Sequence, residues 1–169
     1  MKNMLPAAVA KLAAEVIAVN KAAGRTITTA ESCTGGLVAA ALTEVPGSSA
    51  VLQSGFVTYS NEAKIKTLKV GEELIDTFGA VSVAVAWAMA QGALKCSSAD
   101  VAVAISGVAG PDGGTPSKPV GTVVFALARR GADPEDVVAD KIQFGEDKSR
   151  AEIRMAATLH ALQLLLPSP

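Results

Sequence analysis

Hydrophobic residues recur along the chain at two spacings that alternate from one segment to the next. A repeat of three or four residues predicts an amphipathic helix, whereas alternation with polar residues, or a short unbroken apolar run, predicts a strand. By these spacings, helices are expected over residues 6–23, 33–45, 61–70, 71–79, 82–96 and 149–166. Strands are expected over residues 25–31, 54–60, 100–107, 120–128 and 137–144.

The order of these elements is typical of an α/β protein. Helices and strands first alternate, and the last three strands then follow one another without an intervening helix. The strand over residues 100–107 is apolar on both faces, as expected of a central strand that helices cover on both sides. We therefore predict a three-layer α/β/α sandwich on a mixed sheet of about five strands. No repeat, low-complexity tract or linker divides the pattern, so a single domain over residues 1–169 is expected.

Charge and composition limit the partners and the cellular locations that are expected for this protein. The net charge is -1, and no basic block with interleaved aromatic residues is present, so nucleic acid is not an expected partner. Apolar runs end at Gly, Lys or Pro well before the ~20 residues that a membrane span needs. Residues 1–24 do not resemble a signal peptide, and Cys33 and Cys96 are expected to be free thiols. We therefore expect a cytoplasmic protein that binds neither nucleic acid nor membranes.

The chain contains one histidine, His160, within the last expected helix. It has no Cys or His companion at ligand spacing, so neither a metal site nor another cofactor is expected. A Ser-His-Asp triad is not expected either, because no histidine lies near the polar strand ends. A serine nucleophile would need another base, and lysine is the known substitute.

The segment TTAESCTGG, residues 28–36, places Ser32 where a strand passes into a helix. The amides of residues 33–36 are expected to form the N-terminus of that helix, which binds a phosphate or stabilises an oxyanion if Ser32 attacks a carbonyl. Gly35 and Gly36 allow a ligand to approach the backbone closely. A simple helix cap by Ser32 or Thr34, with the glycines as packing residues, explains this segment equally well.

The segment TYSNEAK, residues 58–64, is expected to place Lys64 in the first turn of a helix that Ser60 or Asn61 caps. The positive end of a helix disfavours an ammonium group. A lysine whose charged form is disfavoured is what a general base requires. The alternative is an exposed lysine that extends into water.

A third segment, residues 105–121, runs from a buried strand into a loop with five glycines and three prolines. It lacks the spacing of a nucleotide-binding P-loop. A loop of this length and composition either follows a fixed path around a ligand or serves as a structural crossover.

Four segments together, TAESCTGG (29–36), GFVTYSNEAK (55–64), GAVS (79–82) and ISGVAGPDGG…KPVGTV (105–123), resemble one known family. It is the C-terminal domain of the competence/damage-inducible protein A (CinA) family, and the resemblance extends over about residues 5–166. Stand-alone members of the family are nicotinamide-nucleotide amidohydrolases. The resemblance therefore implies a metal-free serine amidohydrolase that converts nicotinamide mononucleotide into nicotinate mononucleotide and ammonia.

Matched position by position, the resemblance implies Ser32 as the nucleophile and Lys64 as its base, with Tyr59 as a further catalytic residue. Eight more positions are expected to bind substrate or the oxyanion: Thr34, Gly35, Gly36, Asn61, Ser106, Gly107, Arg150 and Arg154. Among them, Arg150 is a candidate for binding the phosphate, as is the loop over residues 107–114.

Two other functions remain open at this point. The same helix start and glycine-rich loop would suit a module that holds a nucleotide without chemistry. A protein-interaction domain linked to competence or DNA damage is the other alternative. The presence of both Ser32 and Lys64 favours an enzyme. The oligomeric state is open as well, because the Ala-rich helix over residues 82–96 suits either the core, which we favour, or the interface of a homo-oligomer.

Overall fold

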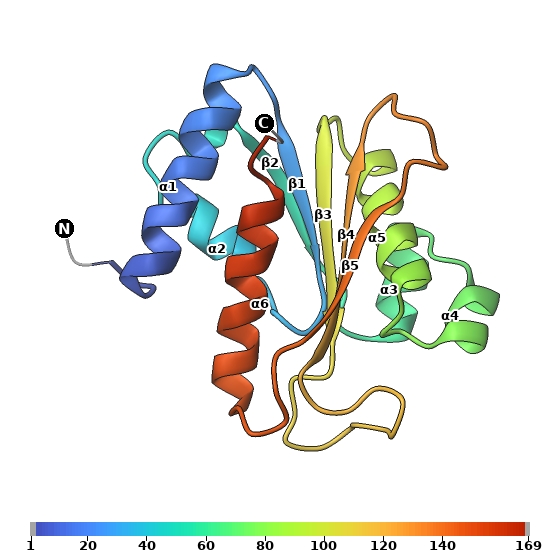
Figure 1. The fold of residues 1–169 in the computed structure, drawn as a ribbon. Coiled ribbons are helices and arrows are strands. Elements are labelled where there is room, and N and C mark those ends of the chain that lie inside the picture. The colour runs from blue at the N-terminus through green and yellow to red at the C-terminus, as the bar shows by residue number, and fades with distance from the viewer. Residues whose placement is uncertain (1–2, 168–169) are drawn as a thin grey trace.

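A mixed sheet of five strands runs through the middle of this computed structural model, which describes residues 3–167 (Figure 1). The strands are β1 (Ile27–Glu31), β2 (Leu52–Val57), β3 (Val101–Gly107), β4 (Thr122–Arg129) and β5 (Val138–Gln143). Their order across the sheet is β2-β1-β3-β4-β5. Strands β2, β1 and β3 are parallel, and β4 and β5 continue the sheet in antiparallel pairing.

Helices cover both faces of the sheet, as Figure 1 shows. One face carries α1 (Ala7–Ala22), α2 (Leu37–Thr43) and α6 (Arg150–Leu164), and the other carries α3 (Asn61–Leu68), α4 (Glu72–Phe78) and α5 (Val83–Lys95). The predicted α/β/α sandwich on a five-stranded mixed sheet is therefore confirmed. No helix within residues 3–167 combines the length and the apolar character that crossing a membrane requires.

Side-chain size differs between the two faces of β3. Val103 and Ile105 pack into the core beneath α1 and α6, whereas Ala102 and Ala104 face α5. Small residues on the sheet and on α5 allow this helix to lie close to the strands. At Gly92 in α5, an added Cβ would collide with the backbone carbonyl of Leu68, so α3 in turn lies against α5 without a gap. This packing fixes the position of α3, which carries Lys64.

Three helices begin at a serine whose hydroxyl accepts a backbone N–H. Ser60 accepts from Ala63 at the start of α3, and Ser82 accepts from Val85 at the start of α5. Ser149 forms a capping box with Glu152 at the start of α6. Ser82 was expected as a cap from the sequence, and Ser60 was one of two candidates with Asn61, because a side-chain oxygen satisfies an N–H that the first turn leaves free.

The structure differs from the sequence-based expectation between β1 and α2. Helix α2 begins at Leu37, not at residue 33, because Gly35 and Gly36 adopt left-handed conformations with φ of 60° and 96°. Residues 32–36 instead form tight turns, in which the amide of Gly35 donates to the carbonyl of Ser32. Strand β2 is also displaced from the expected residues 54–60, and the 3-10 helix η1 (Ser48–Ala50) before it was not predicted.

Candidate active site

The carboxyl ends of the three parallel strands lie at one edge of the sheet, the lower edge in Figure 1. In the strand register, Glu31 at the end of β1 lies opposite Val57 of β2 and Ile105 of β3. Ser32 follows directly, and its amide donates to the carbonyl of Ile105 at 2.9 Å. Segments that are distant in the sequence therefore meet here, as is usual at the strand ends of an open α/β sheet.

Lys64 extends from α3 to Ser32. Its Nζ lies 2.9 Å from the Oγ of Ser32 and 2.8 Å from the carbonyl oxygen of Thr58. Only 1% of Lys64 and 8% of Ser32 is exposed. Neither of these two oxygen atoms carries a charge, and burial lowers the pKa of Lys64 because it removes water from the charged form. The contact thus joins a buried amine of reduced basicity to a hydroxyl.

The thiol of Cys33 lies beside this pair but is not activated. Burial, the largest effect, raises its pKa to about 11, and the carboxylate of Glu31 acts in the same direction. The thiolate is the nucleophilic form of cysteine, so Cys33 is a poor nucleophile near neutral pH. Ser32 is therefore the residue that the adjacent amine can activate.

A pocket of about 230 Å³ opens above the Ser32–Lys64 pair. Its lining includes five further residues that the sequence singled out: Tyr59, Asn61, Ser106, Gly107 and Arg150. Gly107 leaves no room for a side chain, because a Cβ there would lie 2.8 Å from Val123 and 3.1 Å from the sulfur of Cys33. Among the described residues 3–167, the lining contains the cationic side chain of Arg150 and the amine of Lys64, and no carboxylate.

Hydrogen bonds between segments hold the walls of this pocket. The Ser106 hydroxyl donates to the carbonyl of Ala80 at 2.8 Å, which fixes the segment GAVS over residues 79–82. Arg150 donates from Nη1 to the carbonyl of Gly110 and from Nη2 to the hydroxyl of Tyr59, both at 2.7 Å. Arg150 therefore links the glycine-rich loop to the segment that precedes α3.

Four of the expected residues lie outside the lining of this pocket: Thr34, Gly35, Gly36 and Arg154. The guanidinium of Arg154 donates to the carbonyls of Cys33 and Thr34, at 3.0 and 3.1 Å. Its contacts are thus with the backbone of the turn that follows Ser32. The amides of Thr34 and Gly36 donate to no acceptor within residues 3–167.

Glu31, the last residue of β1, was not identified from the sequence, and its carboxylate binds the N-terminus of α2. Its Oε1 accepts from the amide of Val38 and its Oε2 from the amide of Ala39, both at 3.0 Å. These amides belong to the N-terminus of α2, whereas the amides of residues 33–36, which were expected to bind a phosphate or an oxyanion, lie in the turn before the helix. A carboxylate from the protein occupies the N-terminus of α2, so a substrate phosphate needs another partner.

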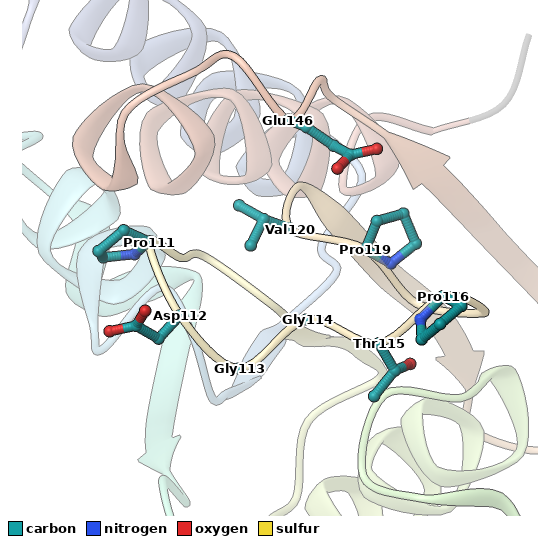
Figure 2. Close-up of a pocket in the computed structure, with 9 residues that line it drawn as sticks. All are labelled: Pro111, Asp112, Gly113, Gly114, Thr115, Pro116, Pro119, Val120 and Glu146. Carbon is teal, nitrogen blue, oxygen red and sulfur yellow. The ribbon is translucent and has the colours of Figure 1, made fainter.

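A second, larger pocket of about 540 Å³ lies within the glycine-rich loop itself (Figure 2). Figure 2 shows the loop from Pro111 to Val120 around this hollow, with Glu146 opposite. Its lining contains the carboxylates of Asp112 and Glu146 and no basic side chain. A phosphate would be repelled there, so the smaller pocket with Ser32 is the better candidate for an anionic substrate.

No metal-binding cluster is present in the part of the chain that the structure describes: three or more His, Cys, Asp or Glu side chains do not gather anywhere in residues 3–167. His160 lies on α6, 2.9 Å from Asp140 of β5, and its ring packs at an angle against Phe125. These contacts place it in the packing between α6 and the sheet. The basic group in contact with Ser32 is therefore the amine of Lys64, and the histidine lies elsewhere, against Asp140 and Phe125.

Known proteins resemble this chain in both sequence and fold. The model of the CinA C-terminal domain family matches residues 9–168. The chain belongs to this family. A crystal structure of competence/damage inducible protein CihA from Agrobacterium tumefaciens superposes with a TM-score of 0.92 at 46% identity, covering 97% of each chain. A CinA superfamily protein from Escherichia coli superposes with a TM-score of 0.87 at 33% identity, covering 98% of this chain and 93% of that one.

Relatives of this family member differ in length. Nicotinamide-nucleotide amidohydrolase PncC from Escherichia coli K12 is 53% identical over 145 residues, which is 86% of this chain and 85% of that protein. A putative competence-damage inducible protein from Symbiobacterium thermophilum is 54% identical over 169 residues, which is 97% of this chain. The chain spans only 38% of the length of that second relative. The family domain therefore occurs both in proteins of similar length and as part of longer ones.

Proposed function

We propose that this protein is a serine amidohydrolase that removes the amide nitrogen of nicotinamide mononucleotide, giving nicotinate mononucleotide and ammonia. The contact of 2.9 Å between Lys64 and Ser32, in a pocket that contains no carboxylate, is the observation that carries the proposal. The 53% identity to a nicotinamide-nucleotide amidohydrolase supports the choice of substrate. In this proposal residues 1–169 act as one amidohydrolase domain, without a metal or another cofactor.

The first chemical step is attack by Ser32 on the carboxamide carbon. Neutral Lys64 accepts the proton of the Ser32 hydroxyl as the Oγ–C bond forms, which leaves an ammonium on Lys64 and an oxyanion on the substrate. The free amides of Thr34 and Gly36 are the donors we assign to that oxyanion. A preorganised donor is effective here because it needs no reorganisation as the charge develops.

Breakdown of this tetrahedral intermediate releases ammonia. The C–N bond breaks, the ammonium of Lys64 gives its proton to the departing nitrogen, and an ester of Ser32 remains. Water then attacks the ester carbon while Lys64 accepts one of its protons. The acid product leaves when the C–Oγ bond breaks and the proton returns from Lys64 to Ser32. One amine thus serves as base and acid alternately.

The remaining lining residues have roles in substrate binding in this proposal. Arg150 presents a guanidinium at the rim of the pocket and suits a phosphate, which it can bind through two parallel hydrogen bonds. Tyr59, which already accepts from Arg150, lies at the same rim. The Ser106 hydroxyl donates a hydrogen bond to the carbonyl of Ala80 and keeps an acceptor lone pair for the carboxamide N–H. Asn61 adds a polar side chain to the same lining.

We place the reaction in the cytoplasm. Cys33 and Cys96 are both free thiols, as is usual for proteins of a reducing compartment. The partner in this proposal is a small nucleotide, not a nucleic acid or a membrane.

The function is tested by incubating the protein with nicotinamide mononucleotide and measuring ammonia, with and without a metal chelator. We expect release of ammonia that the chelator does not reduce. Ser32→Ala should release almost none and should still fold, because nothing buried depends on its hydroxyl beyond the contact with Lys64. Ser98→Ala, an exposed serine outside the pocket, is the matched control and should match wild type. Turnover by Ser32→Ala near the wild-type rate would contradict the assignment.

The pH dependence of kcat/KM tests the role of Lys64. Burial lowers the pKa of Lys64, and the neutral amine is the active form. The fraction of neutral amine rises with pH, so kcat/KM should rise and then level off above an apparent pKa below that of a free lysine. Lys64→Arg should be almost inactive, because a guanidinium does not release its proton. Lys66→Arg, on the exposed side of the same helix, should retain the wild-type profile; an active Lys64→Arg enzyme would require a different base.

Removing Arg150 should weaken the binding of the phosphate selectively. A hydrogen bond to a charged group contributes about 1.5–3 kcal/mol, so Arg150→Ala should raise KM for nicotinamide mononucleotide by about 10- to 100-fold. Steady-state kinetics with nicotinamide riboside, which lacks the phosphate, provide the control. Wild type and variant should be similar on that substrate. An equal rise in KM for both substrates would show that Arg150 acts only on the shape of the pocket.

A further inference from the structure

The residue before the nucleophile carries a buried carboxylate that the catalytic steps above do not use. Glu31 is the last residue of β1 and 0% of it is exposed. It forms no ion pair within residues 3–167, and its partners are hydrogen-bond donors only. The hydroxyl of Thr34 donates to Oε1 at 2.7 Å, and the amides of Val38 and Ala39 bind the two oxygens. The hydroxyl of Thr29 lies farther away, at 3.5 Å from Oε2.

Burial of a carboxylate without a cation is costly unless hydrogen bonds satisfy it. A cap for α2 alone does not need such a group, because a serine or aspartate at the residue before the helix is the usual solution. Gly36 occupies that position and provides no side chain. The cap comes from the preceding strand instead, and it spans the turn that contains Ser32.

The hydrogen bonds of Glu31 connect both ends of this turn. Ser32 follows Glu31 in the chain, Thr34 in the middle of the turn donates to the carboxylate, and Val38 and Ala39 beyond the turn do the same. The carboxylate therefore sets the distance between the end of β1 and the start of α2. The residues between, which include the nucleophile, have little freedom to move.

Arg154 holds the same turn from the other direction. Its guanidinium binds the carbonyls of Cys33 and Thr34. In a trans peptide the N–H points opposite to the C=O, so the amide of Thr34 points away from Arg154. Thr34 is thus fixed at its side chain by Glu31 and at its backbone by Arg154. The direction of the free amide depends on both contacts.

We propose that Glu31 is a positioning residue for the reaction: through the hydroxyl of Thr34 it fixes the turn over residues 32–36, so that the Oγ of Ser32 and the free amides of the turn meet the same carbonyl group. The inference rests on the proposed amidohydrolase function and adds a residue that touches neither substrate nor Lys64. A misplacement of about 1 Å in such a turn is enough to cost on the order of 100-fold in rate.

The test uses Thr34→Val, which removes the hydroxyl and retains the volume of the side chain. Glu31→Gln is the more obvious change, but it places an amide NH2 against the amides of Val38 and Ala39 and endangers folding. We expect Thr34→Val to lower kcat by about 10- to 100-fold with KM within about twofold of wild type. Thr34→Ser restores the hydroxyl and should recover most of the loss of kcat.

Thr29→Val is the matched control, because Thr29 is buried against the same carboxylate but is not part of the turn.

Hydrogen–deuterium exchange of the peptide over residues 32–39 provides a measurement that does not depend on activity. Exchange should be faster in Thr34→Val and unchanged in Thr29→Val. If exchange or kcat is unchanged in Thr34→Val, or if Thr29→Val loses as much kcat, Glu31 does not position the nucleophile. If the wild-type protein releases no ammonia, the proposed amidohydrolase function is wrong, and exchange alone then decides whether Glu31 fixes the turn.

Discussion

The constraint on which the site depends is a lysine held out of water with two uncharged oxygen atoms as partners. Lys64 is 1% exposed and contacts the hydroxyl of Ser32 and the carbonyl of Thr58. Burial lowers the pKa of this amine, because the ammonium loses hydration that two uncharged oxygen atoms do not fully replace. In the proposed mechanism, the same burial that is unfavourable for the charge suits the side chain to act as a base. A stabilising carboxylate beside it would remove that property.

The fold provides this environment by close packing. Alanines on β3 and on α5 bring that helix close to the sheet, and Gly92 lets α3 lie directly against α5. From this position the side chain of Lys64 reaches the end of β1, where its amine contacts Ser32. On the other face, Glu31 and Arg154 hold the turn that presents Ser32. Lys64 therefore comes from a helix on one face of the sheet, and Ser32 from the turn that joins the central sheet to a helix on the other face.

Features that depend on neighbours in the sequence could be predicted from it. The helices, the strands and the caps at Ser60 and Ser82 follow from periodicity and from local hydrogen bonding. Features that depend on distant contacts could not. The role of Glu31 was missed because its partners are backbone amides, which a sequence does not display. The start of α2 was placed too early. Gly35 and Gly36 adopt left-handed conformations in the turn over residues 32–36, and the helical spacing of the sequence does not reveal them. Arg154 was expected at the substrate, and its contacts with two carbonyls appear only in three dimensions.

The charge state of Lys64 in the folded protein tests the account most directly. Nuclear magnetic resonance of the lysine side chains, followed over pH, reports each amine separately, and the Lys64 signal is assigned by its absence from Lys64→Arg. We predict that the Lys64 signals change at a pKa below that of a free lysine, since burial disfavours its ammonium. If Lys64 instead titrated at the pKa of a free lysine, it would be a cation near neutral pH. A base for Ser32 would then have to be found elsewhere.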